Sequence, residues 1–172
     1  MSFTYVGRLD ELKGIKCLFE AWRLMGKKGP VLNVCGTGPL YEWCCDFIDK
    51  YGMNGIKMRG HIEHEQVMAL IYESDAIIVP SLWYEGFPMI IVEAYSAGIP
   101  VIGSNIGNVG SLIEENTTGL TFNTTNVQEL VSLISTFDNT HFSRSRILQN
   151  TKQYNPENNY LILKEVYESI QQ

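Results

Sequence analysis

Short apolar runs and amphipathic stretches alternate along the first 122 residues of the chain. The runs have the length and β-branched content of buried strands, whereas the stretches between them show the 3.6-residue spacing of helices packed on a sheet. Ala76–Val79 is so short and so uniformly apolar that we expect a central strand covered on both faces. The six expected strands are Ser2–Val6, Val31–Cys35, Ile56–Arg59, Ala76–Val79, Val101–Ser104 and Gly119–Phe122.

Helices are expected between these strands and after the last of them. The five in the alternating part lie at about residues 14–25, 39–51, 63–73, 88–97 and 110–115. Later helices are expected from a capping box at Asn126 and Glu129 to about Phe137, from His141 to about Gln153, and from Pro156 to Gln171 with Asn155 as its cap. The alternation predicts an α/β fold, namely a Rossmann-like doubly wound parallel sheet of about six strands with helices on both faces, plus extra C-terminal helices.

Composition and length are those of one globular domain. The 172 residues are 45% hydrophobic and 19% charged. No apolar run approaches the ~20 residues of a membrane span, and the N-terminus lacks the pattern of a signal peptide, so we expect a cytoplasmic protein. The net charge of −6 and the absence of Lys/Arg runs argue against a nucleic-acid surface. The four cysteines lack metal-binding spacing and are expected to be reduced thiols.

The stretch that follows Ala76–Val79 has the features of an anion site. Gly86-Phe87-Pro88 precedes a helix, and free N–H groups at a helix N-terminus bind phosphate together with the helix dipole. Loops at the carboxyl ends of parallel strands are also where open α/β sheets bind ligands. The expected contributors are the backbone N–H groups of Gly86, Phe87, Met89 and Ile90, with Pro88 shaping the turn and donating none.

Two carboxylates flank this turn. Glu93 lies in an otherwise apolar helix, where a carboxylate is costly to bury unless donors reach it. Glu85 lies in the loop, and the spacing alone also allows an exposed loop acid. No Asp-x-Asp motif supplies a metal site, so no metal is expected.

Two cations follow the first strand. Arg8 and Lys13 lie in a loop whose Gly7 and Gly14 allow close backbone approach. A bidentate Arg and a point-charge Lys suit a diphosphate. The alternative is that both are solvated partners of the acidic residues between them.

These motifs together resemble those of the retaining family 4 glycosyltransferases (glycosyl transferases group 1), whose fold is called GT-B. The stretch from Glu85 to Glu93 is similar to the family's Glu-x7-Glu motif, and Val6–Gly14 is similar to its Arg and Lys phosphate clamp. Gly36–Pro39 resembles the family's second glycine turn, and Ala97–Ile102 resembles the start of its next strand. The four motifs occur in the family's order over roughly residues 4 to 122.

The resemblance implies roles for these residues. Arg8, Lys13 and Glu85 would be catalytic, the cations stabilising the leaving diphosphate and Glu85 facing the sugar, while Glu93 would bind the ribose hydroxyls. The other donor-binding residues implied are Gly7, Gly36, Arg59, Gly60, His61, Gly86, Phe87, Pro88, Met89 and Ile90. A lone histidine such as His61 is more often an ordinary loop residue than a residue that reads the base. The donor implied is a UDP-sugar rather than a GDP-sugar, with no cofactor and no metal, and NAD is disfavoured because Tyr41 stands where a dinucleotide fingerprint has its third glycine.

The resemblance also implies a domain organisation. Residues 1–172 would be a single nucleotide-sugar-binding domain, the C-terminal half of a two-domain enzyme, because an inner strand begins at residue 2 with no lead-in. The missing N-terminal acceptor-binding domain would be its partner and would carry any membrane contact, at the inner face. The isolated half would be inactive alone, and the whole enzyme would serve bacterial polysaccharide or glycolipid synthesis. The alternatives are a stand-alone nucleotide-binding or regulatory module and a nucleotide-sugar 2-epimerase of the same fold.

The last expected helix carries an apolar face that such a partner would cover. We therefore expect four large residues of this face to be exposed in the chain by itself. They are Tyr160, Leu163, Tyr167 and Ile170.

Overall fold

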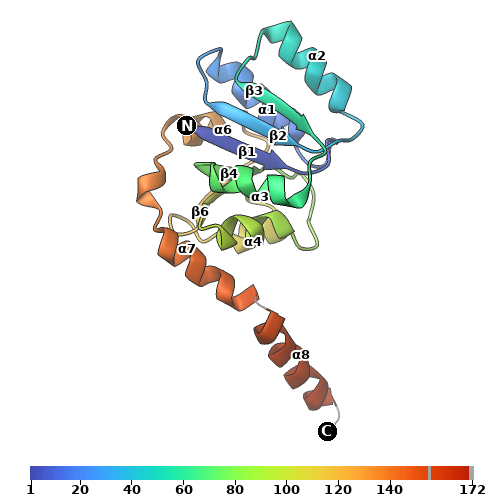
Figure 1. Ribbon diagram of the computed structural model, residues 1–172, viewed down its shortest axis with the longest axis vertical. Helices are drawn as coiled ribbons and strands as arrows, with labels where there is room; N and C mark the ends of the chain where they lie inside the picture. The colour runs from blue at the N-terminus through green and yellow to red at the C-terminus, as the bar shows by residue number, and fades with distance from the viewer. Residues whose placement is uncertain (155, 171–172) are drawn as a thin grey trace.

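The computed structural model of the chain describes residues 1–154 and 156–170 (Figure 1). Its centre is one sheet of six parallel strands in the order β3-β2-β1-β4-β5-β6. The strands are β1 (Ser2–Val6), β2 (Val31–Cys35), β3 (Ile56–Gly60), β4 (Ala76–Val79), β5 (Val101–Ser104) and β6 (Gly119–Phe122). The predicted doubly wound parallel sheet is confirmed.

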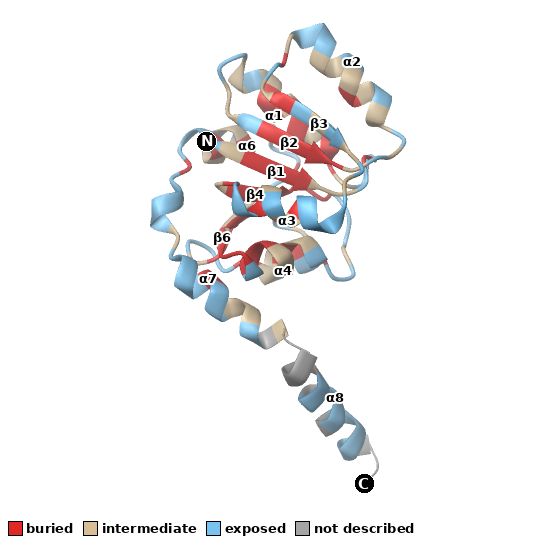
Figure 2. Cartoon of the chain, viewed as in Figure 1, coloured by how far each residue is buried: buried red, intermediate tan, exposed pale blue. Residues whose placement is uncertain are grey.

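Helices cover both faces of this sheet. They are α1 (Ile15–Met25), α2 (Tyr41–Tyr51), α3 (His64–Tyr72), α4 (Met89–Ser96), α5 (Gly107–Leu112), α6 (Val127–Ser135), α7 (Arg144–Asn150) and α8 (Pro156–Ile170), with 3₁₀-helices η1 (Asn139–His141) and η2 (Thr151–Tyr154). One core cluster joins α1, α2 and α6 to one face, and a second joins α3, α4, α5 and α7 to the other. Figure 2 shows that buried residues predominate in the central strands β1, β2 and β4, whereas the edge strand β3 is largely intermediate or exposed.

Alternating side chains of the strands feed the two core layers. Phe3 and Tyr5 of β1 belong to the layer of α1, α2 and α6, whereas Ile77 and Val79 of β4 belong to the other layer. Every residue of β4 is buried, as expected for a strand covered on both faces.

The order in which successive strands are added to the sheet reverses between β1 and β4. β1 pairs with β2 on one side and with β4 on the other, where Phe3 lies beside Ala76. The connections that leave β1 and β4 therefore run to opposite faces. The edge of the sheet between these strands is the position at which open α/β folds hold ligands.

Three helix predictions were wrong in detail. The Asn126 side chain makes no capping hydrogen bond, and Glu129 instead accepts one from the Asn123 N–H at 3.2 Å. The helix expected from residue 141 to 153 is shorter, because Phe142 and Ser143 have extended backbone and α7 begins only at Arg144. After Asn150 the chain continues as the 3₁₀-helix η2. The helix expected at 110–115 begins at Gly107 instead. Asn155 and Gln171 lie outside the described residues.

Helix α8 extends away from the sheet (Figure 1). Tyr160, Leu163 and Tyr167 are 66%, 49% and 66% exposed, which confirms the prediction for these three residues. The Ile170 side chain lies outside the described part of the chain. Among the described helices, none combines the length and the apolar character needed to cross a bilayer.

Candidate functional site

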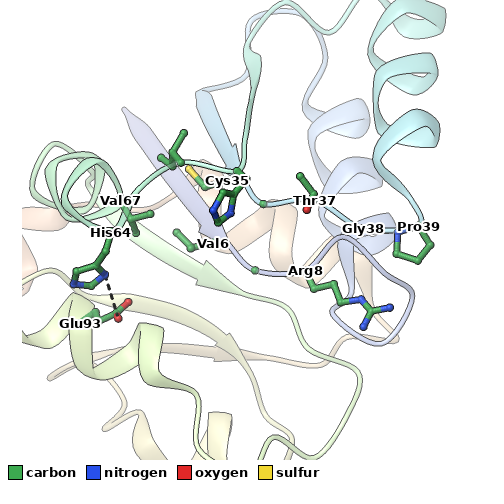
Figure 3. A pocket seen from close by; sticks show the side chains of 13 residues that line it. Val6, Arg8, Cys35, Thr37, Gly38, Pro39, His64, Val67 and Glu93 are labelled. Atoms are coloured by element: carbon green, nitrogen blue, oxygen red, sulfur yellow. Dashed lines mark ion pairs between the residues drawn. The ribbon is translucent and has the colours of Figure 1, made fainter.

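Two hollows meet where β1 and β4 end. The larger cleft has a volume of about 780 Å³ and is formed by the ends of β1 and β2, the segment from His61 into α3, and Glu93 of α4 (Figure 3). The smaller cavity, of about 210 Å³, lies between the loop after β1 and the start of α4. Val6 and Gly7 line both, so the two hollows adjoin at the end of β1.

Lys13 and Glu85 meet in the smaller cavity. The Lys13 Nζ donates to both carboxylate oxygens of Glu85, at 2.6 and 2.8 Å, and the buried Ser81 hydroxyl donates to Oε1 at 2.6 Å. The side chains of Lys13 and Glu85 are 34% and 15% exposed. Glu85 is therefore a shielded carboxylate held by three hydrogen bonds from two donor groups, and not an exposed loop acid.

The loop that carries Lys13 packs directly on the loop that carries Glu85. Gly14 has φ 70°, and a Cβ at this position would lie 1.8 Å from the Pro80 carbonyl oxygen, so only glycine fits. The Leu82 N–H donates to the Leu12 carbonyl at 2.8 Å and joins the same two loops. This close contact is what brings an ammonium and a carboxylate together across 72 residues of sequence.

Arg8 lies on the open side of the larger cleft, across from Glu93 (Figure 3). Its side chain is 66% exposed, and its Nε is 3.2 Å from Asp10 Oδ2. The Tyr5 hydroxyl donates to the Arg8 carbonyl at 2.8 Å, and burial raises the pKa of Tyr5 so that the hydroxyl stays protonated. The backbone of Arg8 is thus fixed while its guanidinium remains accessible to a ligand.

The segment that leads into α4 and the first residues of this helix present unused donors to this edge of the sheet. Within the described chain, nothing accepts a hydrogen bond from the N–H groups of Gly86, Phe87, Met89 and Ile90. Residues 87–90 line the smaller cavity beside Lys13. A helix N-terminus with free N–H groups next to an ammonium can bind a phosphate group.

Comparison with known proteins identifies the family of the chain. The family described as glycosyl transferases group 1 matches residues 2–154. The chain belongs to this family. It is 32% identical over 122 residues to glycogen synthase of Mycobacterium tuberculosis, covering 69% of this chain and 29% of that protein. It is 27% identical over 145 residues to the putative colanic acid biosynthesis glycosyltransferase WcaL of Salmonella typhimurium, covering 80% and 36%.

Solved structures show the same fold. The Anabaena protein Alr3699/HepE in complex with UDP superimposes with a TM-score of 0.80 at 22% identity, over 99% of this chain and 48% of that one. The chain thus spans from under a third to about half of the length of these three proteins. The shared fold is that of GT-B glycosyltransferases.

The predicted site residues of this group 1 glycosyltransferase chain fall into three sets. The larger cleft is lined by Gly7, Arg8, Gly36, His61 and Glu93, and the smaller cavity by Gly7, Lys13, Glu85, Phe87, Pro88, Met89 and Ile90. Gly86 lies in the loop between the two carboxylates. Arg59 and Gly60 lie outside both hollows.

Arg59 is held away from the cleft. Its Nε and Nη2 donate to Asn33 Oδ1 at 3.1 and 2.9 Å, because alternate residues of neighbouring parallel strands share a face of the sheet. The Gly60 carbonyl accepts a hydrogen bond from the Gly36 N–H at 2.7 Å. Gly60 thereby holds Gly36, which lines the larger cleft, although Gly60 itself does not line it.

The sequence pattern alone did not indicate two residues of the larger cleft. His64 opens α3, and its Nδ1 lies 3.9 Å from Glu93 Oε1, as the dashed line in Figure 3 marks. Cys35 lies at the end of β2, where burial raises the pKa of its thiol to about 11. The position of each at the end of a strand or the start of a helix was the available signal. The described residues contain no group of three His, Cys, Asp or Glu side chains that could hold a metal.

Proposed function

We propose that this chain binds the nucleotide of a nucleoside diphosphate sugar and forms the donor half of a retaining glycosyltransferase. The carrying observation is the convergence of Lys13, Glu85 and the free N–H groups of α4 at one edge of the sheet, with Arg8 and Glu93 across the adjoining cleft. The family assignment supports sugar transfer as the reaction. The acceptor half would come from a second domain.

The smaller cavity would take the diphosphate. Lys13 and the N–H groups at the start of α4 supply positive charge and hydrogen bonds where the leaving group gains negative charge. Arg8 is accessible enough to turn from Asp10 toward a second phosphate. Such a set stabilises a leaving diphosphate through side chains and backbone, so we propose that transfer needs no metal.

Glu85 would change partners when the donor binds. In this structure both carboxylate oxygens of Glu85 accept hydrogen bonds from Lys13, and Oε1 also accepts one from Ser81. A bound phosphate competes for the Lys13 ammonium, and the carboxylate released from it becomes free to accept from a sugar hydroxyl. Glu85 would thereby act on the sugar only after the phosphates are in position.

The larger cleft would hold the nucleoside. Glu93 accepts hydrogen bonds and suits the two ribose hydroxyls, while His61 and the backbone around Gly36 lie where a base would extend. The bound UDP of the structurally similar Anabaena protein supports a uridine nucleotide over a guanosine nucleotide. Names of the relatives, glycogen synthase and a colanic acid glycosyltransferase, support a polysaccharide product.

Calorimetric titration of the chain with UDP, GDP and uridine, each with and without EDTA, tests this function. We expect UDP to bind with mid-micromolar to millimolar affinity, since a second domain that would preorganise the cleft does not take part. EDTA should leave the affinity unchanged. The proposal fails if no nucleoside diphosphate shows saturable binding at millimolar concentration, and the metal-free mechanism alone fails if EDTA abolishes binding.

A further inference from the structure

Asn108 of α5 is hydrogen-bonded to the loop that carries Glu85. Its Nδ2 donates to the Glu85 carbonyl at 3.0 Å and also to the Gly86 carbonyl. Asn108 is exposed and lies outside both hollows, so it does not reach a ligand there. Its contacts with the rest of the site are therefore made through the backbone of this loop.

Gly107 allows the contact to form. Its φ is 51°, and a Cβ at this position would lie 2.6 Å from Cδ1 of Tyr84. The Tyr84 ring packs against the Gly107 backbone at the point where α5 begins, so the loop is held at Tyr84 as well as at the next two carbonyls. A side chain at residue 107 would push the loop away from Asn108.

The order of strands decides from which side Asn108 reaches the loop. β4 lies between β1 and β5 in the sheet. Lys13 follows β1, whereas Asn108 follows β5, so the loop after β4 is held by side chains from its two opposite flanks. The hollows lie on the flank of β1, where Gly7 and Lys13 line the smaller cavity.

Two peptide planes connect Asn108 to the donor site. The Glu85–Gly86 and Gly86–Phe87 peptides are trans, like every peptide bond in the described chain. In a planar trans peptide the C=O and the N–H point in opposite directions. Because Asn108 holds the two carbonyls on the flank of β5, the N–H groups of Gly86 and Phe87 point away from that flank.

We propose that Asn108 is a positioning residue, which orients the Gly86 and Phe87 N–H groups toward the phosphates of the donor. It acts through the backbone and touches no substrate. This role rests on the proposed donor site, and it extends that site to a residue of α5. The side-chain amide is required because both of its contacts are donations to carbonyl oxygens.

Backbone dynamics test the clamp without any nucleotide. In ¹⁵N relaxation measurements on the whole chain, Gly86 and Phe87 should be as ordered as the helices, and Asn108→Ala should lower their order parameters below about 0.6. Ser111→Ala is the matched control, because it removes an exposed hydrogen bond from the same helix, to the Asn108 carbonyl at 3.3 Å. Unchanged order at both residues in Asn108→Ala would overturn the proposal.

Titration with UDP and uridine tests the orientation of the N–H groups. Asn108→Ala should weaken UDP binding about five- to tenfold, the size of one lost hydrogen bond, and uridine binding less than twofold. Asn108→Asp should weaken UDP binding more than alanine does, since a carboxylate repels both carbonyls, and Asn108→Gln should restore part of the loss.

The outcomes separate the clamp from the donor site. If the wild-type chain binds no nucleoside diphosphate while Asn108→Ala still frees the loop, the donor function fails and the clamp stands. If the loop is freed but UDP and uridine lose affinity equally, or UDP loses none, the positioning role is refuted. An Asp variant that binds UDP as well as wild type would refute it too.

Discussion

The ion pair of Lys13 and Glu85 should stabilise the unliganded chain by a measurable amount. An exposed pair contributes about 0.2–1 kcal/mol, whereas hydrogen bonds to charged groups contribute about 1.5–3 kcal/mol. Both Glu85 oxygens are engaged, but a third of the Lys13 side chain faces solvent, at 34% exposure. Discounting for this screening, we expect a coupling free energy of about 1 kcal/mol.

A double-mutant cycle measures that coupling. Lys13→Ala, Glu85→Ala and the double variant should each unfold below wild type, and the double variant should lose about 1 kcal/mol less than the sum of the single losses. For a domain of this size 1 kcal/mol corresponds to about 2–4 °C in Tm. A coupling indistinguishable from zero in the absence of nucleotide would refute the view that the pair is a stabilising contact.

The same variants report on competition between carboxylate and phosphate. Lys13→Ala should weaken UDP binding by roughly tenfold or more, and uridine binding little, since Lys13 is proposed to contact phosphate. Glu85→Gln should strengthen UDP binding, because it frees Lys13 and removes a nearby negative charge. Lys16→Ala is the matched control, since Lys16 pairs with Glu11 outside both hollows. Weaker UDP binding by Glu85→Gln would show that the two groups do not compete.

Three further outcomes are expected. Tyr95→Phe should cost about 1–2 kcal/mol in urea unfolding, because the fully buried hydroxyl bonds the Leu112 carbonyl and the Thr118 hydroxyl; an unchanged midpoint would contradict this. Burial raises the pKa of the Cys44 thiol from 9.0 to about 12. The buried neutral thiol therefore contributes its full stabilisation below pH 9, and this contribution falls as the pH rises toward 12. Native Cys44 should resist alkylation at about pH 8.5, and rapid labelling would contradict its burial. Amides of α8 should exchange hydrogen faster than those of α1, as its described apolar residues are exposed; slow exchange would show that the helix packs on its own domain.

The strands were predictable because each is a short buried run bounded by turn residues. All six were predicted to within one residue, Gly60 being the one addition to β3. Helix starts were harder, because several short polar side chains compete for the same N–H groups. At Asn126 the pattern indicated a capping box, yet Glu129 bonds the Asn123 N–H, a contact that depends on how the chain leaves β6.

The sequence predicted which strand ends form the site, but not the contacts that their side chains make. Lys13 and Glu85 follow adjacent strands, so their approach could be expected from the fold, but their direct pairing depends on the contact between Gly14 and Pro80. The position of Arg59 in the motif suggested a donor-binding residue, but the face of β3 on which it lies directs its side chain toward Asn33. Asn108 carries no sequence signal, since its partners are carbonyl groups of a different loop.

The pairing of β1 with β4 at the centre of the sheet has a consequence for the order in which the molecule assembles. β1 and β2 can pair once the short crossover between them has formed a loop. Lys13 and Glu85 meet only when the ends of a loop of 72 residues come together. Closing a longer loop costs more conformational entropy and slows folding. We therefore expect the binding surface to form late in folding, after both halves of the sheet have docked. A ligand held there acts on the finished molecule: it would slow unfolding and leave the rate of folding nearly unchanged.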